Sequence, residues 1–265
     1  MNLVEFPLSL SRHAFGPRDV ARAGHLWRLC QDAAIEGSSR LGWPPSRYAE
    51  IGGAFIVRWM GVVHHREVGF GVPVSGRTWV STFQRGMMTH RQIRVAVGGE
   101  PLLSATQRWV YVAMPQMRPG RAPAPLLESF AAGMPEGEAD VVLPAAEVDE
   151  DGPEHTFSFD LWHGWMDPLA HANHPAYIDW ADEALHRILG EAGVDPQRLE
   201  AVAEEVTYRS GAVAPERVTL RTRRIGTRGA IALFRHVVEG GDGRELAEIT
   251  THRRLVGGDD LLTRM

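Results

Sequence analysis

The 265-residue sequence contains no lysine, so all 28 of its basic residues are arginines. This absence excludes a lysine Schiff base, a lysine general base and the P-loop lysine of nucleotide hydrolases. The chain has a single cysteine, Cys30, which excludes an intramolecular disulfide and a zinc site built on cysteines. Because Cys30 falls within a helical apolar pattern, we interpret it as a buried core residue. A thiol nucleophile is the alternative.

Long hydrophobic runs are also absent: none approaches the roughly 20 residues that span a bilayer. The first 12 residues lack the basic and then apolar pattern of a signal peptide. We therefore expect a cytoplasmic protein with no membrane partner. The net charge of −5 disfavours nucleic acid as a partner. With 44% hydrophobic residues and eight tryptophans, the chain can bury a large core.

Residues 115–154 differ in composition from the rest of the chain. They begin with a proline-rich stretch and, from Glu128 to Glu154, contain nine acidic residues and no basic one. Proline-rich and like-charged segments are typical of extended connectors. We therefore predict a linker over 115–154 that crosses the surface and carries the negative excess of the chain.

Apolar residues recur at helical spacing once on each side of this linker. The first set consists of Leu26, Leu29, Cys30, Ala33 and Ala34. The second set consists of Tyr177, Trp180, Ala181, Ala184, Leu185, Ile188 and Leu189. Pro175 suits the first turn of the second helix, and Gly190 suits its C-terminal cap. Each pattern predicts a helix with one buried stripe.

Each predicted helix is followed by four β-branched and aromatic runs with partial alternation. Glycines at 98–99 and 240–243 separate the third and fourth runs of each set and predict hairpins. A helix with a wide apolar face needs a sheet that curls around it. The sequence therefore predicts an α+β fold built twice, as an N-terminal domain over 1–114 and a C-terminal domain over 155–265.

The segment that leads into the second helix contains the most informative motif. It runs Trp165-Met-Asp-Pro-Leu-Ala-His-Ala-Asn-His-Pro-Ala-Tyr177. This motif resembles the signature of the hotdog-fold acyl thioesterases, in which an Asp precedes a small-residue turn, a His-x-Asn or equivalent, and a Tyr near the start of the central helix. The resemblance implies two tandem hotdog domains, each a long central helix wrapped by an antiparallel sheet.

Weaker similarity to tandem acyl-ACP thioesterases extends over about 240 residues, through segments 31–34, 41–43, 55–60, 78–82 and 206–209. Two positions depart from the plant-type pattern. Leu169 stands where those enzymes carry an Asn, and Gly211 stands where they carry a Glu. Asp167 is therefore the main candidate for a catalytic carboxylate.

Thioester hydrolysis needs a nucleophile, or a base that activates water, and donors for the oxyanion. A carboxylate in the turn before a helix can supply the first, and the unpaired N–H groups of the helix start can supply the second. Asp167 would attack the carbonyl or deprotonate water. We expect the oxyanion donor to be the backbone N–H near His174, since Pro175 has none.

The other residues of the motif each have two alternative roles. His171 either orients Asp167 or the substrate, or only holds the turn. Asn173 either takes part in catalysis or caps the helix. His174 is a candidate through its side chain as well as its backbone. The resemblance implies substrate contacts for six residues whose alternative is an ordinary core or surface role: Tyr177, Glu183, Tyr208, Trp59, Met60 and His64.

The first half has no equivalent constellation. Asp19 and His25 are six residues apart, with no Asn or Pro–Tyr pair after them. We interpret this segment as a decayed copy and predict that the N-terminal domain is non-catalytic.

The resemblance thus implies a thioester hydrolase that acts on an acyl-CoA or an acyl thioester of acyl carrier protein (ACP), in fatty acid or polyketide metabolism, and we expect it in the cytoplasm. We expect no cofactor and no metal, and a monomer with pseudo-dimeric halves or a homodimer. Arginines 221, 223, 224 and 228 could attract an acidic carrier. The alternatives are a hotdog-fold hydratase or dehydratase, a non-catalytic acyl-thioester-binding module, and an enzyme that transfers the acyl group to an alcohol or amine.

Overall fold

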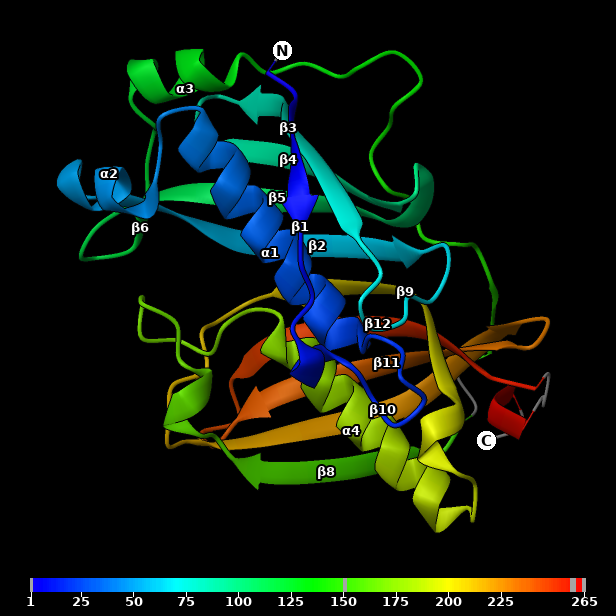
Figure 1. Cartoon of the computed structure of the whole chain (residues 1–265). Coiled ribbons are helices and arrows are strands. Elements are labelled where there is room, and N and C mark those ends of the chain that lie inside the picture. Colours follow the sequence, from blue (N-terminus) through cyan, green and yellow to red (C-terminus); the bar gives the residue numbers. More distant parts are fainter. Residues whose placement is uncertain (1, 150–151, 258–260, 264–265) are drawn as a thin grey trace. The chain divides into compact units, whose positions relative to one another are not determined.

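The computed structural model describes residues 2–149, 152–257 and 261–263, and the chain divides into two compact units (Figure 1). Unit 1 comprises Met1–Phe15 and Leu26–Val142, and unit 2 comprises Gly16–His25 and Leu143–Met265. Each unit holds one long helix and an antiparallel sheet, so the predicted α+β fold is confirmed.

The sheet of unit 1 has five main strands in the order β1-β3-β4-β5-β2, each antiparallel to its neighbour. These are β1 (Val4–Leu8), β2 (Gly53–His64), β3 (Val74–Gln84), β4 (Met88–Val97) and β5 (Glu100–Ala113). The predicted hairpin between β4 and β5 is confirmed. Gly98 and Gly99 form its turn with φ of 58° and 87°, a conformation that favours glycine.

The long helix of unit 1 is α1 (Ala23–Arg40). Its predicted stripe is confirmed, since all five of its members are buried and Cys30 is completely so. Two further short helices, α2 (Pro45–Glu50) and α3 (Ala124–Phe130), and the 3-10 turn η1 (Arg12–Ala14) complete the unit. A cluster of aromatic and aliphatic side chains, which includes Trp43, Tyr111 and Phe130, packs near the end of α1.

The sheet of unit 2 runs β9-β12-β11-β10, and both β7 and β8 pair with the outer side of β10. The strands are β7 (Glu147–Val148), β8 (Glu154–Asp160), β9 (Leu199–Tyr208), β10 (Arg217–Arg228), β11 (Ile231–Gly240) and β12 (Glu245–Leu255). The second predicted hairpin, between β11 and β12, is confirmed. Its turn contains Gly243 with φ of 80°.

The long helix of unit 2 is α4 (Ala176–Glu191), and all seven residues of its predicted stripe are buried. The stripe packs on strand residues such as Phe234 and Leu255. The predicted cap at Gly190 is wrong, because this residue lies inside the helix. The chain leaves α4 at Gly193, which has φ of 72°, while the Val194 N–H donates to the Leu189 carbonyl at 2.9 Å. The 3-10 turns η2 (His163–Trp165), η3 (Pro196–Arg198) and η4 (Leu261–Thr263) are short.

The segment 115–154, expected as a linker, carries α3, β6 (Arg118–Pro119), β7 and the start of β8. Within it, Leu126 and Phe130 of α3 are buried in unit 1. The boundary between the two units falls after Val142. Two of the nine acidic residues of the segment 115–154, Glu150 and Asp151, lie outside the described residues.

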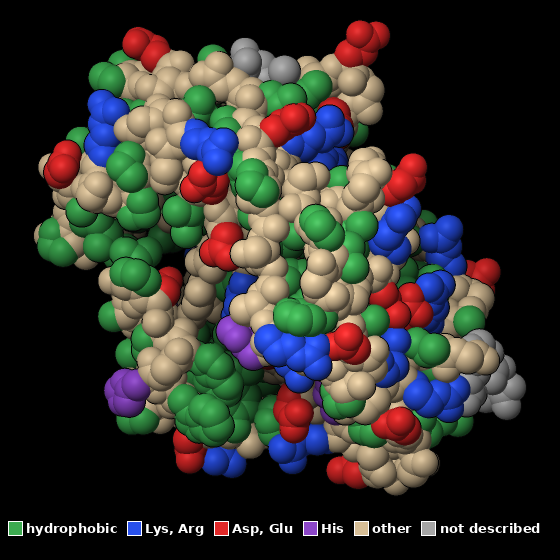
Figure 2. Space-filling model, viewed as in Figure 1, with side chains coloured by type: hydrophobic (Ala, Val, Ile, Leu, Met, Phe, Trp, Pro, Cys, Tyr) green, Lys and Arg blue, Asp and Glu red, His purple; other side chains and the backbone are tan. Residues whose placement is uncertain are grey.

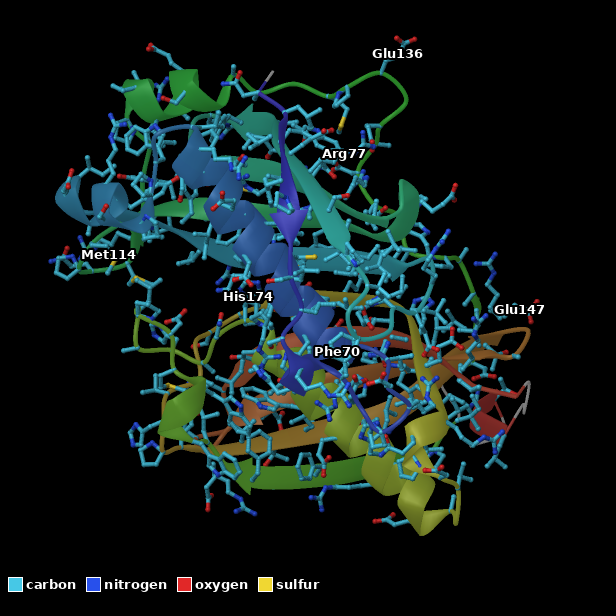
Figure 3. All side chains as sticks on the ribbon, in the orientation of Figure 1. Phe70, Arg77, Met114, Glu136, Glu147 and His174 are labelled. Carbon is cyan, nitrogen blue, oxygen red and sulfur yellow. The ribbon has the colours of Figure 1, made fainter. Side chains whose placement is uncertain are left out.

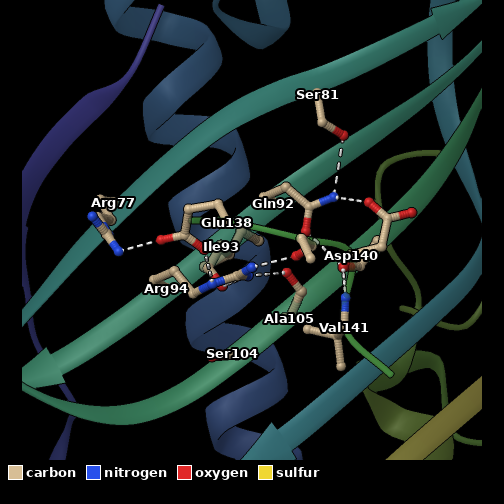
Figure 4. A network of polar contacts seen from close by, with 12 residues as sticks. Arg77, Ser81, Gln92, Ile93, Arg94, Ser104, Ala105, Glu138, Asp140 and Val141 are labelled. Atoms are coloured by element: carbon tan, nitrogen blue, oxygen red, sulfur yellow. Dashed lines mark hydrogen bonds and ion pairs between the residues drawn. The ribbon is translucent and has the colours of Figure 1, made fainter. Parts of the chain in front are cut away.

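Two other acidic residues of this segment bind the outer face of the unit 1 sheet (Figure 4). Glu138 accepts hydrogen bonds from Arg77 and from Arg94, the latter at 2.9 Å. Asp140 accepts one from Gln92 at 2.6 Å and lies 3.0 Å from Nδ1 of His90. The acidic character of the segment thus complements polar and basic side chains of β3 and β4.

No helix within the described residues combines the length and the apolar character needed to cross a membrane.

Candidate active site

Asp167 lies in a tight turn between η2 and α4. Its backbone N–H donates to the His171 carbonyl at 2.8 Å, and its carbonyl accepts from Ala170, which has φ of 60°. The carboxylate oxygen Oδ1 accepts the Leu169 N–H at 2.8 Å and lies 3.4 Å from the His171 N–H. Within the residues that the structure describes, the second oxygen, Oδ2, accepts no hydrogen bond. One oxygen therefore holds the turn while the other is available for chemistry.

Backbone hydrogen bonds attach this turn to the rest of unit 2. The Ala172 N–H donates to the Ala212 carbonyl at 2.8 Å, and the Asn173 N–H donates to Trp165 at 2.8 Å. The Asn173 carbonyl accepts the Ala176 N–H at 2.9 Å, which closes the first turn of α4. The turn that holds Asp167 is thus joined by backbone hydrogen bonds to the segment that leads into α4.

His174 also lies immediately before α4 (Figure 3). Its carbonyl accepts the Tyr208 hydroxyl at 2.9 Å, and its ring lies edge-on to that of Tyr208 with centroids 6.0 Å apart. This contact fixes the backbone at the position where we expect the oxyanion donor.

His171 lies against the backbone of Gly211. A Cβ atom at residue 211 would come within 2.2 Å of Cδ2 of the His171 ring. The space that a side chain at 211 would take is therefore filled by His171. This contact gives a physical reason for glycine at the position where the sequence departs from the plant-type pattern.

Tyr177 and Tyr208 are buried beside the turn, with ring centroids 5.3 Å apart at 89°. Burial is the main cause that raises the pKa of each hydroxyl above its usual value, so both are neutral at physiological pH. The Ala212 backbone and the charges of Glu216, Arg244 and Asp167 have smaller effects on the pKa of Tyr177 than burial has. The structure thus places His171 in the Asp167 turn, and it joins Tyr177, Tyr208 and His174 to one another through ring contacts.

Glu216 and Arg244 were not predicted, and the structure adds them to this region. Nη2 of Arg244 lies 2.9 Å from both carboxylate oxygens of Glu216 and donates to the Gly211 carbonyl at 3.3 Å. Glu216 in turn accepts the Val213 N–H at 2.5 Å. This ion pair holds the 211–213 backbone that His171 and Tyr177 contact. No local sequence pattern could have paired residues 28 positions apart.

No protein-family model and no curated protein sequence matches the chain significantly. Several solved structures do. A structure from Lactobacillus plantarum assigned as an oleoyl thioesterase is similar with a TM-score of 0.81 at 16% identity, over 96% of each chain. An acyl-ACP thioesterase from Bacteroides thetaiotaomicron gives 0.76 at 12% identity, over 95% of this chain and 98% of that one. The 12:0-ACP thioesterase from Umbellularia californica gives 0.74 at 15% identity, over 96% and 97%.

The chain has the double-hotdog fold. The fold expected from the Asp167 motif is therefore confirmed, and the repeat extends to the turn that precedes each long helix. In the first turn, the Gly16 N–H donates to the Val20 carbonyl at 2.9 Å, as Asp167 does to His171. Asp19 has φ of 57°, as Ala170 has 60°.

The residue of the first turn that matches Asp167 is thus Gly16, not Asp19. The alignment of Asp19 with Asp167 that the sequence suggested is displaced by three residues. At the matching position the first double-hotdog half has no side chain that could act as a base.

The four other predicted substrate residues belong to α4 and to β2. Glu183 lies two helical turns into α4, where its carboxylate pairs with Arg187 at 2.9 Å. Trp59, Met60 and His64 lie on β2 of unit 1. Met60 is completely buried, and the Arg108 guanidinium lies 4.2 Å above the Trp59 ring. Their contacts with substrate stay predictions.

Exposed aromatic rings adjoin the turn. Trp162 is 69% exposed and stacks on Trp165 with centroids 5.1 Å apart, and Trp165 contacts Phe159 and Trp180. Figure 2 shows a patch of hydrophobic side chains in this region, near β8 and the segment that follows it. Apolar surface at the entrance to a site suits a ligand with an apolar part.

In the described part of the chain, no group of three or more His, Cys, Asp or Glu side chains could hold a metal ion. The Asp167 carboxylate itself has the chemistry of a base or of a nucleophile.

Proposed function

We propose that this protein is a thioester hydrolase that releases a carboxylic acid from an acyl-CoA or an acyl-ACP, with Asp167 as its catalytic residue. The observation that carries the proposal is the Asp167 carboxylate itself. Its Oδ1 is anchored by the Leu169 N–H, its Oδ2 is available, and it precedes the N-terminus of α4. The likeness to thioesterase structures supports the same reaction class.

Two reaction routes use this carboxylate. As a general base, Oδ2 takes a proton from water, and the water oxygen bonds to the thioester carbonyl carbon. The carbon–sulfur bond then breaks, and the proton passes to the departing thiolate. As a nucleophile, Oδ2 bonds to the carbonyl carbon and expels the thiolate, and water cleaves the resulting anhydride.

Both routes place a negative charge on the carbonyl oxygen. The start of α4 lies at the positive end of its helix dipole, which favours a negative charge there. The backbone N–H near His174 is the donor that we assign to this oxyanion. His171 orients Asp167 or the substrate, and Tyr177 and Tyr208 form a neutral wall of the site.

The acyl group of the substrate is carried by coenzyme A or by ACP. Three of the four clustered arginines are paired with acids: Arg221 with Glu239 at 2.6 Å, Arg223 with Glu154 at 3.6 Å, and Arg224 with Asp149 at 2.6 Å. This cluster therefore provides less free positive charge for an acidic carrier than the sequence suggested.

The test is thiol release from a panel of acyl-CoA and acyl-ACP thioesters. Asp167→Asn keeps an oxygen that can accept the Leu169 N–H but removes the base, so kcat should fall by about 10²–10⁴-fold. Asp160→Asn is the matched control, because Asp160 is exposed and pairs with Arg217.

Equal release by Asp167→Asn and the wild type would refute the role of Asp167. Absence of release with any thioester would refute the hydrolase and favour an acyl-binding module. Hydration of an enoyl thioester without thiol release would favour a hydratase, and transfer of the acyl group to an added alcohol or amine in preference to water would favour a transferase.

A further inference from the structure

Among the described residues, each unit contains one arginine that is almost completely buried beneath its long helix. In unit 2 this is Arg253 of β12, with 1% of its side chain exposed. Its guanidinium contacts two carboxylates, Asp182 of α4 at 2.7 Å and Glu204 of β9 at 2.7 Å. The charge of Arg253 is therefore neutralised within the fold.

The buried arginine of unit 1 is Arg91 of β4, which is 6% exposed. Its Nη2 donates to Oγ of Ser38 on α1 at 2.9 Å, and its Nη1 donates to Oγ1 of Thr78 on β3 at 3.3 Å. In the part of the chain that the structure describes, no carboxylate lies within ion-pair distance of Arg91. Hydroxyl groups satisfy two N–H bonds but do not neutralise the charge.

A buried cation without an anion is costly, because the protein interior solvates a charge much less well than water does. Burial lowers the pKa of Arg91 to about 10, so the guanidinium is still protonated at neutral pH. In unit 2 the fold supplies two carboxylates to the buried Arg253, whereas in unit 1 it supplies only hydroxyl groups to Arg91.

The surroundings of Arg91 resemble a receptor for an amphipathic anion. The Tyr48 hydroxyl lies near Ser38 and Arg91, and the Arg91 guanidinium lies 5.4 Å from the centre of the Phe130 ring. Phe130 belongs to the aromatic cluster at the end of α1. Ser38 and Tyr48 are only partly buried, so the surroundings of Arg91 reach the protein surface at these two side chains.

Gly37 makes the arrangement possible. A Cβ atom at this position of α1 would come within 2.3 Å of Cγ2 of Thr78 and 3.1 Å of Nη1 of Arg91. The Thr78 hydroxyl also donates to the Gln92 carbonyl at 2.8 Å, so it anchors the guanidinium. The hydroxyls of Ser38 and Tyr48 are the groups that can turn toward a ligand.

We propose that Arg91, with Ser38 and Tyr48, forms a binding site in unit 1 for the carboxylate of a ligand that has an apolar body. The planar guanidinium can offer paired N–H groups to a carboxylate, and hydroxyls can donate to the same oxygens. The aromatic cluster covers the apolar body. Two sources share this chemistry: a free carboxylic acid, such as the product of the proposed reaction, and the distal carboxylate of a dicarboxylic acyl chain.

Equilibrium binding tests the site without any turnover, so it does not depend on the proposed hydrolase activity. Decanoate and decanol are titrated into the full-length protein and followed by calorimetry. The wild type should bind decanoate at least tenfold more tightly than decanol, and decanoate alone should raise its Tm. Equal binding of the two ligands would overturn the proposal.

Two variants assign the preference to Arg91. Arg91→Met removes the charge but keeps an apolar chain, and it should bind decanoate no better than decanol. Arg94→Met is the matched control, because Arg94 lies on the outer face of the same strand and pairs with Glu138. It should keep the preference. The assignment would be refuted if Arg91→Met kept the preference for decanoate over decanol, or if Arg94→Met lost this preference while Arg91→Met kept it.

A kinetic comparison distinguishes the two sources and rests on the proposed function. If the ligand is a free acid, Arg91→Met weakens inhibition by decanoate and affects the KM of a dicarboxylic monothioester and of its methyl-ended analogue equally. If it is a distal carboxylate, Arg91→Met raises the KM of a dicarboxylic monothioester by at least tenfold but not that of its methyl-ended analogue. If the enzyme is active and Arg91→Met shows neither of these two effects, the site has no role in substrate or product binding.

Discussion

Gly16 and Asp167 occupy the same position in two copies of one turn. Each N–H closes its turn on the residue four positions later, at 2.9 Å for Gly16 and 2.8 Å for Asp167. The two backbones therefore match, and the side chain is the chemical difference at this position. This comparison supports the prediction that only the second half carries the catalytic carboxylate.

Gly16→Asp should be tolerated without creating a second site. A Cβ at residue 16 meets no atom closer than 3.7 Å, so the free energy of unfolding should change by no more than about 0.5 kcal/mol. In the Asp167→Asn background it should not restore thiol release, because the first half lacks the other groups of the motif. Denaturant unfolding and a thiol assay measure both effects. Recovered activity would show that the first half can support catalysis.

Gly211→Ala should displace His171, because the added methyl group would overlap its ring. We expect a loss of about 1–3 kcal/mol in the free energy of unfolding, as for other overpacked positions. The shift next to Asp167 should also lower kcat by about 10²-fold. Gly164→Ala is the control, since its Cβ would meet nothing within 4 Å. Similar kcat values for the two variants would argue against a role for the His171 position.

Arg253→Met should destabilise the protein by about 3–5 kcal/mol, because it leaves Asp182 and Glu204 buried without their cation. Replacement of all three residues by apolar ones should recover most of this loss. Arg254→Met, at the neighbouring position, removes a half-exposed ion pair with Glu200 and should cost less than about 1 kcal/mol. Urea unfolding compares the variants. Equal losses for the two single variants would contradict this account of the buried network.

His236 should make the protein less stable in mild acid. Burial first, and then the charge of Arg253, lower the pKa of His236 to about 3, and its ring nitrogens lie 2.8 Å from Thr222 and 3.0 Å from Thr251. The unfolded chain takes up a proton below pH about 6.5, whereas the folded chain does not. Stability is thus complete above that pH and falls by about 1.4 kcal/mol per pH unit as the pH drops toward 3.

His236→Gln can still hydrogen-bond the two threonines but has no proton to gain, so the loss of stability between pH 7 and pH 5 should be smaller in this variant. The control is His163→Gln at an exposed position. Urea unfolding at both pH values measures the difference. The same loss in His236→Gln and the wild type would contradict the assignment to His236.

The sequence by itself determined the local elements. The stripes of α1 and α4 follow from the spacing of apolar residues, because a helix presents every third or fourth residue to the same side. The turn at Gly98 and Gly99 follows from a backbone conformation that glycine adopts without strain. The Asp167 motif could be recognised because its residues lie within one short segment.

Only the tertiary structure decided which distant groups meet that motif. Glu216 lies directly before β10 and Arg244 directly before β12, and their pairing depends on how the strands of the sheet are arranged. The match between Gly16 and Asp167 was hidden because it depends on backbone hydrogen bonds and a positive φ, not on similar side chains. Likewise, the sequence contains Arg91 but does not show that its side chain is buried beside hydroxyl groups and not beside a carboxylate. Burial and charge pairing arise from packing between residues far apart in the chain, which local patterns do not encode.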